Sequence, residues 1–115
     1  MYYVKLIRSP NQLKKYRAII YINSKKYKYV DFGQYGASDY TIHKDYDRMI
    51  HYLSRHTHKT DWKNVRSINL LRSSKEDWDN IFTAGFWSRW LLWSLPSLRD
   101  AKKLISKKFR VQFVS

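Results

Sequence analysis

The alternation of apolar and polar residues at both ends of the chain predicts a β-sheet. Residues 2–7 (YYVKLI) are rich in β-branched and aromatic side chains and are followed by a Ser-Pro-Asn turn signal at residues 9–11. Two β-prone runs lie within residues 15–32 on either side of Asn23-Ser24, which is typical of a two-residue hairpin turn. Residues 109–114 (FRVQFV) alternate strictly and predict a closing strand. We therefore expect a small antiparallel sheet made of this hairpin and the two terminal strands.

The middle of the chain changes to a helical period. Apolar residues fall at i, i+4, i+7, i+8 and i+11 from Ile42 to Leu53, which predicts a helix over residues 42–56, with Asp39 or Thr41 as its N-cap. Capping boxes predict two further helices: a short one after Ser73 and Ser74 carrying Trp78, Ile81 and Phe82, and one over residues 97–107, which Ser97 and Asp100 begin. The fold class is therefore α+β, a single domain over residues 1–115 with about three short helices packed against the sheet.

Residues 84–93 (AGFWSRWLLW) are dense in aromatic and leucine side chains. Such a run is either a platform on which nucleic-acid bases stack or part of the core, and the core is the more common case. Arg89 within it then needs a partner, for which Asp77, Asp79 or a helix C-terminus are the candidates.

The distribution of charge adds a functional expectation. The chain carries 23 Lys and Arg against 9 Asp and Glu, a formal net charge of +14. Residues 1–30 hold eight basic residues and no acid, and residues 101–115 hold five and no acid, so the middle of the chain is nearly neutral. Two acid-free ends favour a polyanionic partner: DNA, RNA, anionic lipid or an acidic protein.

Composition excludes several kinds of chemistry. There is no cysteine among the 115 residues, so disulfides, thiolate catalysis and Cys-based zinc sites are ruled out. No apolar leader follows the N-terminus, and the most apolar window, residues 81–95, is too short to span a membrane and contains Arg89. We expect a soluble intracellular domain with no membrane partner.

Two patterns on the predicted helix over residues 42–56 suggest sites. His43, Asp47 and His51 are spaced i, i+4, i+8, which could hold a metal or form an acid–base pair. Alternatively, the two histidines could simply be capped or hydrogen-bonded by neighbouring residues. On an adjoining face, Arg48 and Arg55 flank Tyr52, with His56 beside Arg55. Two guanidiniums at this spacing either grip a phosphate or pair internally with Asp39, Asp45 or Asp79. No phosphate-binding glycine loop or Ser-His-Asp order is present.

Three motifs resemble those of a small domain of unknown function encoded by nucleocytoplasmic large DNA viruses of the mimivirus-like, chlorella-virus-like and iridovirus-like groups. The motifs are residues 32–45 (FGQYGASDYTIHKD), Arg48 with residues 52–56 (YLSRH), and residues 84–93; residues 14–17 (KKYR) also fit. Residues 65–75 depart from the pattern as an insertion. The resemblance implies a viral protein in the virion, or in the host cytoplasm during assembly, but implies no mechanism.

The leading hypothesis is a non-enzymatic virion protein that binds viral DNA electrostatically, with little sequence preference, no cofactor or metal and no small-molecule substrate. The alternative is a minor capsid protein that binds capsid proteins and cements capsomers on the inner face of the capsid. A third hypothesis is a metal-dependent DNA-processing enzyme that uses His43, Asp47 and His51. The residues predicted to bind nucleic acid are Lys14, Lys15, Arg17, Lys25, Lys26, Lys28, Arg48, Arg55, Lys102, Lys103, Lys107, Lys108 and Arg110.

Overall fold

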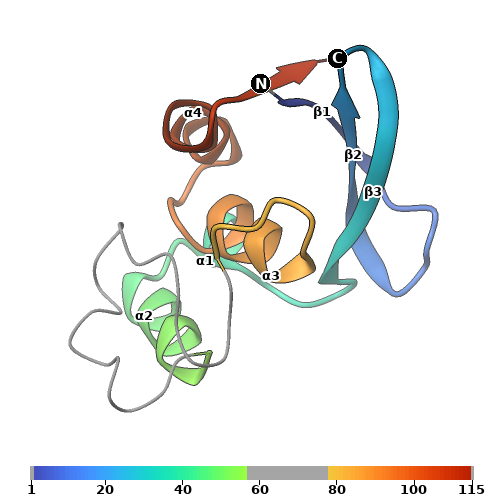
Figure 1. Cartoon of the computed structure of the whole chain (residues 1–115). Coiled ribbons are helices and arrows are strands. Elements are labelled where there is room, and N and C mark those ends of the chain that lie inside the picture. The colour runs from blue at the N-terminus through green and yellow to red at the C-terminus, as the bar shows by residue number, and fades with distance from the viewer. Residues whose placement is uncertain (1, 57–77, 115) are drawn as a thin grey trace.

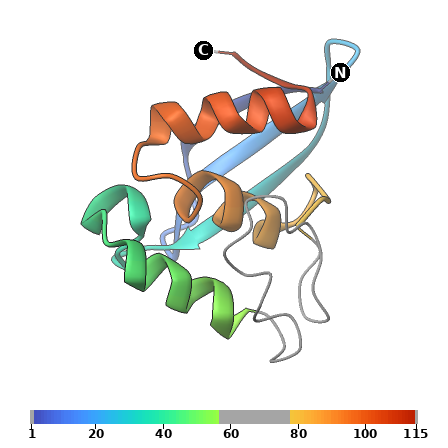
Figure 2. The same cartoon turned by 90° about the vertical axis from the view of Figure 1, so that its left-hand side faces the viewer.

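The computed structural model describes residues 2–56 and 78–114. Four strands form one sheet in the order β3-β2-β1-β4: β1 (Tyr2–Arg8), β2 (Lys14–Ile22), β3 (Lys25–Gln34) and β4 (Val111–Val114). The helical elements are α1 (Tyr40–His43), α2 (Tyr46–Arg55), α3 (Ala84–Trp87), the π-helical turn η2 (Ser88–Leu92) and α4 (Leu98–Phe109). All of them lie on one side of the sheet (Figures 1 and 2). The predicted α+β class is confirmed.

The β2–β3 hairpin is also confirmed, and its turn explains why it forms at Asn23-Ser24. Both residues have positive φ, 52° and 68°, as a type I′ turn requires, and this turn matches the twist of the two strands it joins. The strands then pair from Ile22–Lys25 to Lys14–Gln34, with an irregularity between Ile20 and Tyr21.

The closing strand is present, but its predicted direction is wrong. β4 pairs with β1 in parallel, with Val111 opposite Tyr2 and Phe113 opposite Val4, so the sheet is mixed rather than antiparallel. A left-handed turn at Arg110 (φ 56°) ends α4 and places Val111 beside the first residue of β1. Alternation specifies which face a residue takes and carries no information about strand direction.

The helix predicted over residues 42–56 is two helices. Asp39 caps α1, Lys44 ends it in a left-handed conformation, and Asp45 caps α2 by accepting from the backbone N–H of Arg48. Two acidic caps only six residues apart begin two helices, and the backbone between them cannot remain helical. Ile42 is consequently exposed, although the helical period placed it on the buried face.

The remaining helix predictions have different outcomes. The one over residues 97–107 is confirmed as α4, whose N-cap Ser97 accepts from the backbone N–H of Asp100. The capping boxes at Ser73 and Ser74 lie outside the described residues. The described part of that predicted helix, residues 78–82, forms turns instead.

The tryptophan-rich run belongs to the core, as predicted. Trp87 and Trp90 are fully buried, and Trp87 stacks on Phe32 of β3 at 5.9 Å between ring centroids. Each indole N–H finds a carbonyl: Trp87 donates to Ile81 at 2.8 Å and Trp90 to Trp78 at 2.6 Å. These two bonds hold the segment around Trp78 and Ile81 against α3 and η2.

Gly33 and Gly36 provide a matched test of packing between the sheet and η2. Both have positive φ, but a Cβ at Gly33 would lie 3.0 Å from Cδ1 of the buried Leu92, whereas nothing lies within 4 Å of one at Gly36. We expect Gly36→Ala to lower the free energy of unfolding by about 1–2 kcal/mol through backbone strain alone. Gly33→Ala should cost about 1–3 kcal/mol more through overpacking. Urea unfolding of both variants checks this, and equal losses would show that Leu92 yields freely.

Candidate nucleic-acid interface

The residues predicted to bind nucleic acid fall into three groups in space. Lys14 and Lys15 lie where β2 begins, at the end of the sheet nearest Arg48 and Arg55. A second group follows the hairpin: Arg17, Lys25, Lys26 and Lys28. A third belongs to α4 and its C-cap: Lys102, Lys103, Lys107, Lys108 and Arg110. Because β1 pairs with β4, the two acid-free ends are neighbours in the sheet, but α4 lies on its helical side (Figure 2).

The first group lines two adjoining clefts that share Lys15. The first cleft has a volume of about 540 Å³, with Arg8, Lys14 and Lys15 on its wall. The second, of about 370 Å³, is lined by Lys15, Arg48 and Arg55. We call the two together the basic groove. It brings together cations from β1, β2 and α2 that are far apart in the sequence.

Among the described residues that line the groove, Asp39 is the one acid, and its carboxylate is fully engaged. It is 2% exposed and accepts from Lys15 Nζ at 2.6 Å, and from the backbone N–H and hydroxyl of Thr41. Two of the three internal partners predicted for Arg48 and Arg55 make other contacts: Asp39 pairs with Lys15, and Asp45 caps α2. Arg48 and Arg55 themselves are exposed on the surface of α2.

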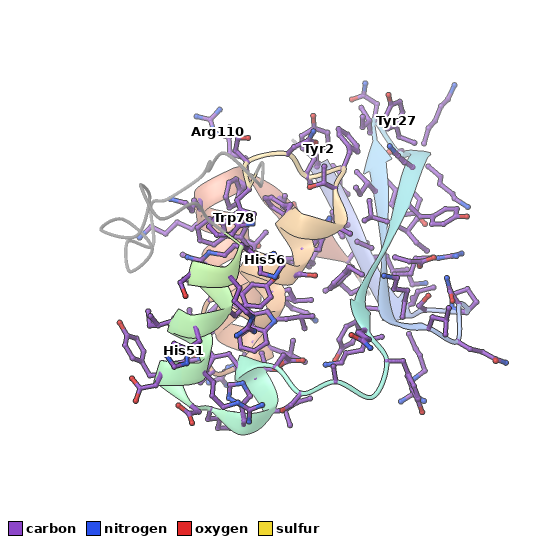
Figure 3. The ribbon with its side chains drawn as sticks, turned by 90° about the horizontal axis from the view of Figure 1, so that it is seen from below. Tyr2, Tyr27, His51, His56, Trp78 and Arg110 are labelled. Atoms are coloured by element: carbon purple, nitrogen blue, oxygen red, sulfur yellow. The ribbon has the colours of Figure 1, made fainter. Side chains whose placement is uncertain are left out.

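An aromatic column forms one wall of the second cleft. Tyr52 of α2 stacks on Trp93 with ring centroids 4.3 Å apart and planes within 1°, and His56 lies 4.3 Å from the other side of Tyr52. Figure 3 shows His56 at the end of α2 beside the α3–η2 turns, with His51 on the side of α2 away from the sheet. The stack fixes α2 against η2 and so positions Arg48 and Arg55.

The second cleft also unites the three sequence motifs. Its lining includes Gly33 and Asp39 from the first motif, the Arg48–His56 motif, and Trp93 from the third. Residues that are scattered along the chain therefore share one surface. Neither composition nor periodicity indicated this convergence.

The structure breaks the proposed His43–Asp47–His51 face. His43 belongs to α1, on the other side of the turn at Lys44, and its Nδ1 accepts from the backbone N–H of Asp45. Asp47 and His51 lie on α2 and are exposed. Within the described parts of the chain, no group of three His, Cys, Asp or Glu side chains is arranged to hold a metal ion.

Arg89 is buried among tryptophans, and its partner is the C-terminus of η2, one of the candidates named from the sequence. It is 2% exposed, its Nη1 donates to the carbonyl of Trp93 at 3.1 Å, and its guanidinium carbon lies 4.3 Å from the ring centroid of Trp90. Its Nε has no hydrogen-bond acceptor among the described residues, and Asp77 lies outside them. Burial lowers the pKa of Arg89 to about 10.

Sequence reasoning missed Arg8 and the aromatic residues on the open side of the sheet. Arg8 lies in the groove because it pairs with Tyr16 across β1 and β2, which no local pattern in the sequence indicates. The sequence of β2 does contain a signal for these aromatic residues. The side of β2 that faces away from the helices carries Ile19 and Tyr21, where a solvated strand would carry polar residues.

Comparison with known proteins gives one match. Residues 4–56, just under half of the chain, match the profile of a family of unknown function (DUF5754). The matched segment runs from β1 to the end of α2 and contains all five cations of the basic groove. Searches of curated proteins and of solved structures found no match. Among the described residues, no helix has the length and apolar character needed to cross a membrane.

The ion pair between Lys15 and Asp39 predicts a large effect of substitution. Asp39→Ala removes both the cap of α1 and the partner of a largely buried ammonium, so we expect it to lower the free energy of unfolding by about 3–5 kcal/mol. Asp45→Ala, the matched control, removes a helix cap alone and should cost about 1 kcal/mol. Chemical denaturation measures both. If the two losses are equal, the ion pair contributes nothing beyond capping.

The burial of Arg89 predicts that an apolar substitution at this position destabilises the protein less than a lysine does. The fold lowers the pKa of its guanidinium, so keeping this group charged lowers the free energy of unfolding at every pH below about 10. An apolar side chain at this position removes that cost. We expect Arg89→Met to lie within about 1 kcal/mol of the native protein. Arg89→Lys should be less stable than Arg89→Met, since a compact ammonium is more strongly hydrated and cannot also stack on Trp90. A methionine variant much weaker than the lysine variant in urea unfolding would contradict this reasoning.

Proposed function

We propose that this protein binds nucleic acid without catalysing a reaction on it, and that the basic groove contacts the phosphate backbone. The observation that supports this is the convergence of Arg8, Lys14, Arg48 and Arg55 on two clefts that meet at Lys15, whose own charge is balanced by Asp39. Guanidinium groups bind phosphate through parallel hydrogen bonds, and clustered cations raise the local concentration of a polyanion.

The charge of the sheet favours the same partner. The four strands carry eight Lys and Arg but only one acid, Asp31, which is already paired with Arg17 at 2.8 Å. A polyanion bound here meets no unpaired carboxylate on the strands. Because phosphate contacts carry no sequence information, the proposed binding has little sequence preference.

The proposal extends to a biological setting through the motifs that converge on the second cleft. Their resemblance to a domain of nucleocytoplasmic large DNA viruses supports a role in the virion, with the viral DNA as the partner. In such a setting a small basic protein would neutralise part of the charge of a packaged genome.

A second function, a minor capsid protein that cements capsomers on the inner face of the capsid, is favoured by a separate observation. Leu13 is 74% exposed and Tyr35 is 67% exposed at the groove end of the sheet, and apolar side chains this open are typical of protein contacts. Copies that remain with shells emptied of DNA would support this function, and copies released together with the genome would support DNA binding.

The proposal predicts a steep dependence of DNA affinity on salt. If Arg8, Lys14, Arg48 and Arg55 each neutralise one phosphate, log K should fall with log salt at a slope of about −4, which fluorescence anisotropy with a labelled duplex measures. Lys14→Gln and Arg48→Gln should each make the slope shallower by about 1. Arg99→Gln is the matched control, since Arg99 is an exposed arginine outside both clefts and should leave the slope unchanged.

Two outcomes would contradict it. Absence of binding at about 50 mM salt, where electrostatic contacts are strong, would rule out nucleic acid as the partner. An equal effect of Arg99→Gln and Arg48→Gln would show that net charge, rather than the groove, is responsible.

A further inference from the structure

The side of the sheet that faces away from the helices carries aromatic and cationic residues in neighbouring positions. We call this side the outer face; no helix among the described residues lies over it (Figure 1). Tyr3 stands opposite Tyr21 across β1 and β2, and Ile19 stands opposite both Lys5 and Tyr29. Tyr3 is 36% exposed and Tyr29 is 47% exposed. A solvated sheet face is ordinarily polar, so this composition indicates an interaction surface.

Arg17 forms a preorganised platform in the middle of this face. Its Nε and Nη2 donate to the two carboxylate oxygens of Asp31 at 2.8 and 3.0 Å, and its guanidinium carbon lies 3.8 Å from the ring centroid of Tyr29. The hydrogen bonds from Arg17 lower the pKa of Asp31, so the pair stays ionised well into the acid range. Asp31 and Tyr29 together hold the guanidinium plane in place before any ligand arrives.

A depression of about 480 Å³ lies at the other end of the outer face. Tyr3 and Tyr21 form its aromatic wall, and the hairpin turn at Asn23 and Ser24 closes it together with Val114. Its lining therefore combines stacking surfaces with backbone and side-chain hydrogen-bonding groups. This is the composition of a site for a planar, polar ring.

We propose that the outer face binds single-stranded nucleic acid, with bases stacked on Tyr3, Tyr21 and the Arg17–Tyr29 platform. This inference rests on the proposed function and adds to it the class of nucleic acid. Aromatic rings and guanidinium planes stack on unpaired bases, whereas the bases of a duplex are already stacked on one another. Lys5 and Lys26 lie beside these rings and supply charge for the phosphates.

The position of the basic groove is consistent with one continuous strand. Arg8 is the last residue of β1 and Lys14 the first of β2, so the groove lies at one end of the two strands that carry the outer face. Arg8 lies about 17 Å along β1 from Tyr3, at about 3.4 Å per residue, and takes the helical side of the sheet, like Val4 and Leu6. A strand whose phosphates are held in the groove can pass around this end of the sheet and then run along the outer face toward the depression.

Charge argues against a second copy of this chain as the occupant. Two outer faces in contact would bring Lys5 and Lys26 of both copies into one interface, and the one acid on the described strands, Asp31, is already paired with Arg17. Like charges opposed at an interface disfavour association. A polyanion with planar groups satisfies both the cations and the rings.

The test compares four probes on the whole protein by fluorescence anisotropy. They are labelled oligothymidylate of about 15 nucleotides, oligouridylate, an abasic strand and a duplex, all of the same length, which lies within the usual site size of such proteins. The abasic strand keeps the phosphates and lacks the bases. We expect the native protein to bind oligothymidylate more tightly than the abasic strand and the duplex at equal salt. Comparison of thymidylate with uridylate then distinguishes DNA from RNA.

Variants locate the effect on the outer face. Tyr3→Leu and Tyr29→Leu should weaken single-strand binding by about five-fold to 100-fold, the usual range for a lost stacking contact, and leave duplex binding unchanged. Tyr29→Phe should retain binding because the ring alone stacks. Tyr46→Leu is the matched control, since Tyr46 is exposed to a similar extent as Tyr29 but lies on α2.

The outcomes separate this inference from the proposed function. Equal binding of the abasic strand and oligothymidylate by the native protein overturns the inference, even if the leucine variants fail to fold, and leaves electrostatic binding intact. A dimer that Tyr29→Leu dissociates, without any change in single-strand affinity, overturns it in favour of self-association. Failure of the native protein to bind any of the four probes at low salt overturns both.

Discussion

The ion pair between Lys15 and Asp39 is the contact on which the geometry of the groove depends. Lys15 belongs to the start of β2, and Asp39 caps α1, which leads through one turn into α2. This contact therefore ties the sheet to the helix that carries Arg48 and Arg55. The stack of Tyr52 on Trp93, in the same cleft, then fixes this helix against η2. A buried ion pair adds little net stability compared with an apolar pair, but removing one of its partners leaves an uncompensated charge and is strongly destabilising.

The charge of the chain has two different uses. Lys15 and Arg17 are held in ion pairs, where each cation organises its surroundings and its charge is already compensated. Lysines such as Lys25, Lys26 and Lys103 are exposed and remain available to a polyanion. Net charge alone therefore overstates the number of phosphate contacts, and the arrangement around each residue decides its role.

Much of the fold was predictable because its signals are local. The hairpin followed from Asn23-Ser24, α4 from its Ser97 cap, and the core from the density of tryptophan. The direction of β4 was not predictable, since alternation is the same for parallel and antiparallel strands. The break at Lys44 was not predictable from the apolar period, because that period continues through Lys44. The break forms because Asp45 caps a new helix, α2, directly after it.

The candidate site was less predictable than the fold. Arg48 and Arg55 were identified as possible phosphate ligands from their spacing on one helix, which is a local property. Their union with Arg8 and Lys14 depends on how strands and helices pack, and no window of sequence contains it. The outer face required knowledge of the register, which places Tyr3 beside Tyr21 and Ile19 beside Tyr29.

The parallel pairing of β1 with β4 has a consequence for the order in which the molecule assembles. β1 is a central strand, but the neighbour on one of its sides comes from residues 111–114, nearly the whole chain away. During synthesis, β1, β2 and β3 can pair as soon as they emerge, whereas the free edge of β1 stays uncovered until the last strand is made. An open strand edge is a template for pairing with other chains. The interval between these two events is thus the period in which this protein is most exposed to misassembly, and Lys5 and Arg8 place positive charge along that edge while it lasts.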